Sequence, residues 1–205
     1  MALLGFDEAD LTGRLERIPW QVRVLFAAAC AERLAPSYAT FSASTGSGDP
    51  LALGNFLSRL WEDIAGKQMA DNEVEVLIKE CMELWPREDD EPEVLEQSQA
   101  EDAAAAVAYA LRCRRSREAQ EAAWFARRVF EAIADYVATR ESIDPNSPDA
   151  EIRVLAHPLV QSELSRQDRD LDELAWLGQA DVRDVARRFH DRAKREPAIV
   201  FPVPP

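Results

Sequence analysis

Apolar side chains recur at helical spacing along almost the whole of this 205-residue chain. Val22, Leu25 and Phe26 begin a pattern of i, i+3, i+4 that predicts a helix from about Trp20 to Leu34. The same spacing returns in residues 53–64, 74–85, 119–137 and 158–195, and a short helix is expected over 149–156. A helix with one apolar face must bury it against another element, and no convincing pair of strands is present. We therefore predict an all-α, single-domain bundle of about seven or eight helices over residues 1–205.

Three parts of the chain differ from a simple amphipathic helix. Residues 103–111 are apolar on all sides and predict a central helix. The stretch 158–195 is interpreted as either one long helix or two, with Gly178 at the possible break. Residues 87–97 carry a run of acids and are predicted to be a solvated linker, whereas the proline-rich, apolar tail 197–205 is predicted to be extended. This tail is expected to pack on the body of the protein or on a second copy of the chain.

The formal net charge of -14 is concentrated in one segment, because residues 62–102 hold 15 acids and 3 bases. An acidic surface repels nucleic acids and anionic membranes, so neither is expected as a partner. Two explanations of this charge remain open: the acidic surface binds a basic protein partner, or it only aids solubility.

Several features of the sequence indicate a cytoplasmic protein. The longest apolar run has nine residues, far fewer than the roughly 20 that a membrane-spanning helix needs. The first ten residues carry acids where a secretory signal would be basic. The three cysteines are widely spaced, so we expect buried, reduced thiols rather than disulfides or a zinc site.

Residues able to do chemistry are few. His157 and His190 are the only histidines, and neither is accompanied by the spaced ligands of a metal site. The sequence also has no Gly-x-Ser-x-Gly motif, which would expose a nucleophilic serine. His157 precedes Pro158 and is interpreted as a helix cap. The turn Thr45–Asp49 contains Gly46 and Gly48 and is interpreted either as an anion-binding nest or as a turn into a helix capped by Asp49. No catalytic residue, metal or cofactor is assigned.

The region around this turn resembles a known family. The ordered set of residues that carries the resemblance is Arg14-Leu15, Trp20-Gln21, Phe26, Glu32-Arg33, Pro36, Tyr38, Phe41, Thr45 to Asp49 and Trp61-Glu62. It is similar to the N-terminal signature of the YjaG-like bacterial proteins, filed as domain of unknown function number 416. The resemblance implies a compact all-helical bacterial protein, with no established reaction, cofactor or partner. It also implies that any site would be built from the family-like residues.

Two functions remain open. The first is a non-enzymatic protein-binding or regulatory module, which uses the acidic surface for a basic partner or the tail for self-association as a homodimer. The second is a small-molecule binder or enzyme with a pocket at the Thr45–Asp49 turn, where Glu32 and Asp49 pair as acid and base. The candidate ligand-binding residues for that pocket are Trp20, Glu32, Arg33, Tyr38, Gly46, Gly48, Asp49 and Glu62. The absence of a catalytic set favours the first.

Overall fold

A computed structural model of the chain describes residues 3–85, 95–177 and 182–199. Ten α-helices and no strands are found in these ranges. The helices are α1 (Glu8–Glu16), α2 (Trp20–Leu34), α3 (Pro36–Thr45), α4 (Pro50–Ile64), α5 (Asp71–Glu83), α6 (Leu95–Ser116), α7 (Ala119–Arg140), α8 (Ala150–Leu155), α9 (Pro158–Ala175) and α10 (Val182–Arg195). The predicted all-α fold class is confirmed.

The helices expected from the sequence, seven or eight in number, are all present, and α1 and α3 are additional. The stretch 158–195 forms two helices, α9 and α10. Pro36, which interrupts the stripe of α2, is the first residue of α3. A proline is tolerated in the first turn of a helix, because the N–H that it lacks would have no intrahelical partner there. The proline therefore separates two helices rather than leading into a turn.

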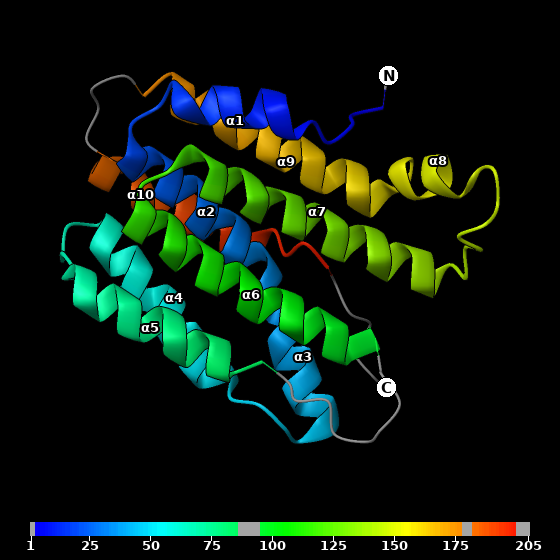
Figure 1. The fold of residues 1–205 in the computed structure, drawn as a ribbon, viewed down its shortest axis with the longest axis horizontal. Helices are drawn as coiled ribbons and strands as arrows, with labels where there is room; N and C mark the ends of the chain where they lie inside the picture. The colour runs from blue at the N-terminus through cyan, green and yellow to red at the C-terminus, as the bar shows by residue number, and fades with distance from the viewer. Residues whose placement is uncertain (1–2, 86–94, 178–181, 200–205) are drawn as a thin grey trace.

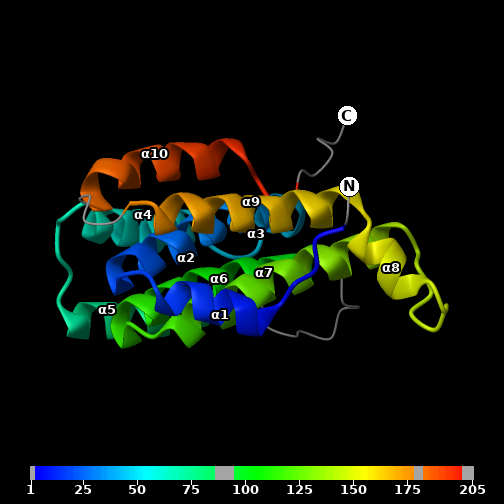
Figure 2. The same ribbon diagram turned by 90° about the horizontal axis from the view of Figure 1, so that it is seen from above.

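The helices pack in layers around α2 and α6 (Figure 1). Seen from above, α9 and α10 lie on one side of α2, while α6 and α7 lie on the other (Figure 2). The middle of helix α6 is enclosed, since almost every side chain from Asp102 to Leu111 is buried and α2, α3, α5 and α7 all pack against it. This confirms the central position predicted for residues 103–111.

Capping residues fix where two of the helices begin. Asp49 accepts a hydrogen bond from the backbone N–H of Ala52, 2.9 Å away, and so caps α4. At the start of α9, Nδ1 of His157 accepts a hydrogen bond from the N–H of Leu159 at 3.2 Å. Both caps are followed by a proline at the first helical position. The capping roles predicted for Asp49 and His157 are therefore confirmed.

The predicted linker and tail are described in part. Most of the linker near 87–97 falls on residues 86–94, outside the described ranges, and residues 95–97 belong to α6 rather than to a linker. In the tail, residues 200–205 are outside the described ranges, but Ala198 and Ile199 are buried. The N–H of Ala198 donates to the carbonyl of Arg33 at 2.8 Å, so this part of the tail packs on the body of the protein.

Bilayer-spanning helices are not found within the described ranges, where no helix has both the length and the apolar character required.

Candidate functional site

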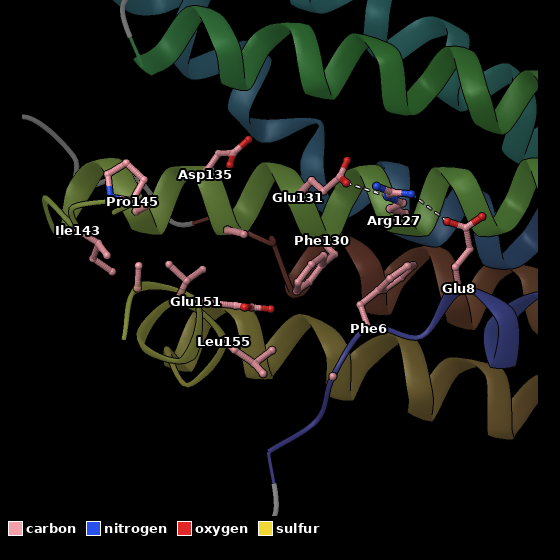
Figure 3. Close-up of a pocket in the computed structure, with 15 residues that line it drawn as sticks. Phe6, Glu8, Arg127, Phe130, Glu131, Asp135, Ile143, Pro145, Glu151 and Leu155 are labelled. Atoms are coloured by element: carbon pink, nitrogen blue, oxygen red, sulfur yellow. Dashed lines mark hydrogen bonds and ion pairs between the residues drawn. The ribbon is translucent and has the colours of Figure 1, made fainter. Parts of the chain in front are cut away.

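A cleft with a volume of about 730 Å³ lies at one end of the bundle, between the N-terminal segment, α7 and α8 (Figure 3). The chain turns back after α7 through residues 141–149 and enters the short helix α8, which faces α7 across the cleft. Residues 5–8 form the third side. The cleft is therefore built from segments that lie more than 100 residues apart in the sequence.

The floor of the cleft is apolar. Phe6 and Phe130 stack with their ring centroids 5.4 Å apart and their planes 13° from parallel. Ile143 continues this surface after α7, and Val154 and Leu155 continue it on α8. These side chains offer a ligand a continuous apolar contact, which is the usual character of a binding site.

The rim of the cleft is acidic. Its charged residues are Glu8, Arg127, Glu131, Asp135 and Glu151. Arg127 is engaged twice, by Glu131 at 2.8 Å and by Glu8 at 3.2 Å. Asp135 and Glu151 have no ion-pair partner among the described residues, so the rim keeps an excess of negative charge.

Asp135 and Glu151 come from different helices and point in different directions. In Figure 3 the Glu151 side chain extends from α8 toward Phe130, whereas the Asp135 carboxylate projects from α7 on the side away from α8. Partial burial raises the pKa of Asp135, and the nearby carboxylate of Glu131 raises it further. The guanidinium of Arg128 acts in the opposite direction, and a further positive group at this edge would favour the ionised carboxylate of Asp135. The cleft is thus suited to a ligand that carries cationic and apolar groups together.

The sequence-predicted residue Glu32 lies away from this cleft. It accepts a hydrogen bond from the indole Nε1 of Trp61 at 2.9 Å, and it lies 3.4 Å from Nε2 of His190. The imidazole of His190 stacks on Trp61, with 4.5 Å between ring centroids. Glu32 therefore connects α2 with α4 and α10.

Arg33 is the centre of a buried ionic network. Its guanidinium binds both carboxylate oxygens of Glu163, at 2.7 and 3.0 Å, and Oδ2 of Asp170 at 2.8 Å. All three side chains are 1% exposed. Burial alone would lower the pKa of Arg33, but the carboxylates raise it well above its ordinary value. The network joins α2 to α9, and Arg192 of α10 completes it by binding Asp170 at 2.9 Å.

The glycine turn is filled by Tyr38. The Tyr38 hydroxyl donates to the carbonyl of Leu84 at 2.7 Å and accepts from the N–H of Asp49 at 3.4 Å. Gly48 has a φ of +80°, and a Cβ placed there would lie 2.8 Å from the Tyr38 hydroxyl. Gly46 has a φ of +72° and ends α3. The structure thus brings Tyr38, Gly48 and Asp49 together in a packed turn.

Trp20 and Glu62 lie outside the cleft, the Arg33 network and the glycine turn. Trp20 lies beside the guanidinium groups of Arg114 and Arg117, at 5.3 and 4.7 Å from its ring centroid. The pKa of Glu62 is lowered by a hydrogen bond from Lys67. Glu32, Arg33 and Asp49 likewise have separate partners, so the acid–base pairing of Glu32 with Asp49 is not formed. A role of the eight candidate residues in ligand binding stays a prediction.

A metal site is not indicated by the part of the chain that the structure describes, where no group of three or more His, Cys, Asp or Glu side chains is arranged to hold an ion. The acidic rim of the cleft has its carboxylates spread along α1, α7 and α8 and paired in part with Arg127.

The cleft was not predicted from the sequence. Phe130 is part of the apolar stripe of α7, and Glu131 and Asp135 occupy positions typical of the polar face of any helix. The signal that was available is the break at residues 144–148 before a short helix, because such a break folds one helix back on the other. Phe6 gave no signal, since its partner Phe130 is distant in sequence.

Comparison with protein families finds that residues 10–188 match the family described as protein of unknown function (DUF416). The match extends well past the signature in residues 14–62. The fold is similar to that of the crystal structure of a DUF416 family protein from Shewanella baltica OS155, with a TM-score of 0.80 and 20% sequence identity over 94% of each chain. No curated protein matches this chain.

Proposed function

The chain belongs to the DUF416 family, whose function is unknown, and we propose that it is a protein-binding module whose cleft between α7 and α8 accepts a basic segment of another protein. The observation that carries this proposal is the combination of an apolar floor with an acidic rim in the cleft between α7 and α8. A segment with lysine or arginine beside leucine-like side chains matches both features.

Charge at the rim supports a basic partner. Four of the five charged rim residues are acids, and the fifth, Arg127, is held by Glu8 and Glu131. Asp135 and Glu151 are left to pair with an incoming cation. Opposite charges across an interface speed association and select the partner, while contact with the floor supplies most of the affinity.

The test is binding of a labelled peptide of about eight residues that contains four lysines and two leucines, measured by fluorescence anisotropy. The double substitution Asp135→Asn with Glu151→Gln is expected to weaken binding by about five- to tenfold at low salt, because partly exposed ion pairs contribute up to about 1 kcal/mol each. The matched control is Glu80→Gln with Glu83→Gln, which removes two exposed acids from α5. This control is expected to change the affinity by less than twofold.

A second peptide with glutamate in place of lysine keeps the leucines and reverses the charge. It is expected not to bind. Equal affinity for the two peptides, or equal loss in the cleft and control variants, would refute the cleft as a site for a basic segment.

A further inference from the structure

A second hollow adjoins the cleft on the other side of the N-terminal segment. It lies between α1 and α9, has a volume of about 210 Å³ and shares Gly5 and Phe6 with the cleft as lining residues. The two hollows are therefore separated only by the extended segment that precedes α1.

The second hollow repeats the chemistry of the cleft. Leu11, Leu164 and Leu171 provide an apolar floor. Its charged residues are Asp7, Asp10, Arg14 and Asp168. Arg14 is bound to Asp168 and to Asp172, each at 2.7 Å, so acids outnumber the single engaged base here too. No hydrogen bond or ion pair of the Asp10 carboxylate is found among the described residues.

The segment between the hollows is held at both ends but open in the middle. The Gln161 side chain of α9 binds the backbone of Leu4 twice, accepting from its N–H and donating to its carbonyl, each at 2.9 Å. Phe6 is held by its stack on Phe130. At Gly5, between them, no atom lies within 4 Å of the place that a Cβ would take. A ligand chain has room to cross the segment at this position.

We infer that the two hollows are subsites of one binding groove, and that a basic partner segment long enough to cross at Gly5 places an apolar side chain in each. The inference rests on the proposed function, since the same class of partner occupies both subsites. The complementary charge of both rims is what selects this occupant.

The experiment compares two peptides on the full chain. The short peptide is the lysine–leucine probe used above, and the long peptide is two such units joined by two glycines. A long peptide whose second unit is replaced by serine and glycine serves as the length control. In the wild type, the complete long peptide is expected to bind at least tenfold more tightly than the short one, because the second contact becomes intramolecular. If only one site exists, the long peptide is expected to bind about twofold more tightly than the short one, because either of its two units can occupy that site.

Asp10→Lys is the variant that tests the second subsite. It is expected to reduce the advantage of the long peptide to about twofold while leaving the affinity for the short peptide within about twofold of wild type. Asp184→Lys is the matched control, because it reverses an exposed acid in the first turn of α10. It is expected to keep the full advantage.

Gly5→Trp tests the crossing point, and Gly54→Trp is its control, since a Cβ at either glycine meets no atom within 4 Å. Of these two variants, only Gly5→Trp is expected to abolish the higher affinity of the long peptide over the short one. If the short peptide binds the wild type but the long peptide gains no more than twofold, or keeps its advantage in Asp10→Lys, the two-subsite groove is wrong and the proposed function stands. If the short peptide itself does not bind, both fail.

Discussion

Replacing Arg33 with methionine tests how much the buried ionic network contributes to stability. The substitution keeps an unbranched side chain of similar length but removes the guanidinium. Glu163 then loses its bidentate partner, although Arg166 remains 3.5 Å from it. Asp170 keeps Arg192 at 2.9 Å and Arg169 at 3.2 Å. The damage is therefore concentrated on Glu163, a carboxylate that is 1% exposed.

The expected loss in the free energy of unfolding at pH 7 is about 3–5 kcal/mol, which is typical of removing one partner from a buried ion pair. Most of this loss reflects the unpaired carboxylate that is left behind. A second substitution, Glu163→Gln, removes that charge and is expected to recover about 1–3 kcal/mol in the double variant. The recovery separates the effect of the charge from the loss of packing.

The measurement is urea unfolding followed by circular dichroism. Arg14→Met is the matched control, because Arg14 also binds two acids but is 26% exposed, and its loss is expected to be at most about 1 kcal/mol. Equal losses for Arg33→Met and Arg14→Met would refute the reasoning. So would a double variant less stable than Arg33→Met.

Three further predictions concern ionisation, backbone conformation and thiol access. Burial raises the pKa of Asp102 to about 6, despite its ion pair with Arg128, so this carboxylate lowers stability progressively as the pH rises from about 4 to 6. Asp102→Asn is expected to gain about 1–3 kcal/mol at pH 7 and nothing at pH 3.5, as measured by urea unfolding at both values; an equal gain at both would contradict this. Gly48→Ala is expected to lose about 1–3 kcal/mol in the free energy of unfolding, because of its positive φ and the 2.8 Å approach to Tyr38, whereas Gly54→Ala on the exposed face of α4 should gain up to about 1 kcal/mol, both measured by urea unfolding. All three cysteines are buried, which raises the pKa of their thiols, so the native protein should react with Ellman's reagent only after denaturation; rapid native labelling would show that the packing around them is looser.

The helices that could be predicted from the sequence are those with a long apolar stripe, such as α2, α4 and α7. Helix α1 was missed because it buries only Leu11 and Leu15, which is too few for a periodic signal. Helix α3 was missed because small residues dominate it and only Ser37, Tyr38 and Phe41 are buried. In both cases tertiary packing, rather than local pattern, determines the conformation.

The candidate site was harder to predict, because its residues come together only through the tertiary fold. Arg33 was named as a candidate ligand-binding residue, but its partners in the structure, Glu163 and Asp170, lie 130 and 137 positions away. Nothing in the sequence distinguishes Glu151 from other acids on a helix, because only the position of α8 opposite α7 brings it to the cleft. A single sequence contains no information about such pairings, so the spacing of residues along the chain was insufficient to locate the cleft.

The enclosed position of α6 has a consequence for biosynthesis. A helix that is apolar on every side would promote aggregation with other nascent chains if it stayed exposed to solvent after leaving the ribosome. Four of the helices that contact it, α2, α3, α4 and α5, are translated earlier, and the fifth, α7, follows after two residues. The order of elements along the polypeptide thus allows most of its cover to be present before α6 emerges, and the remainder to arrive directly afterwards.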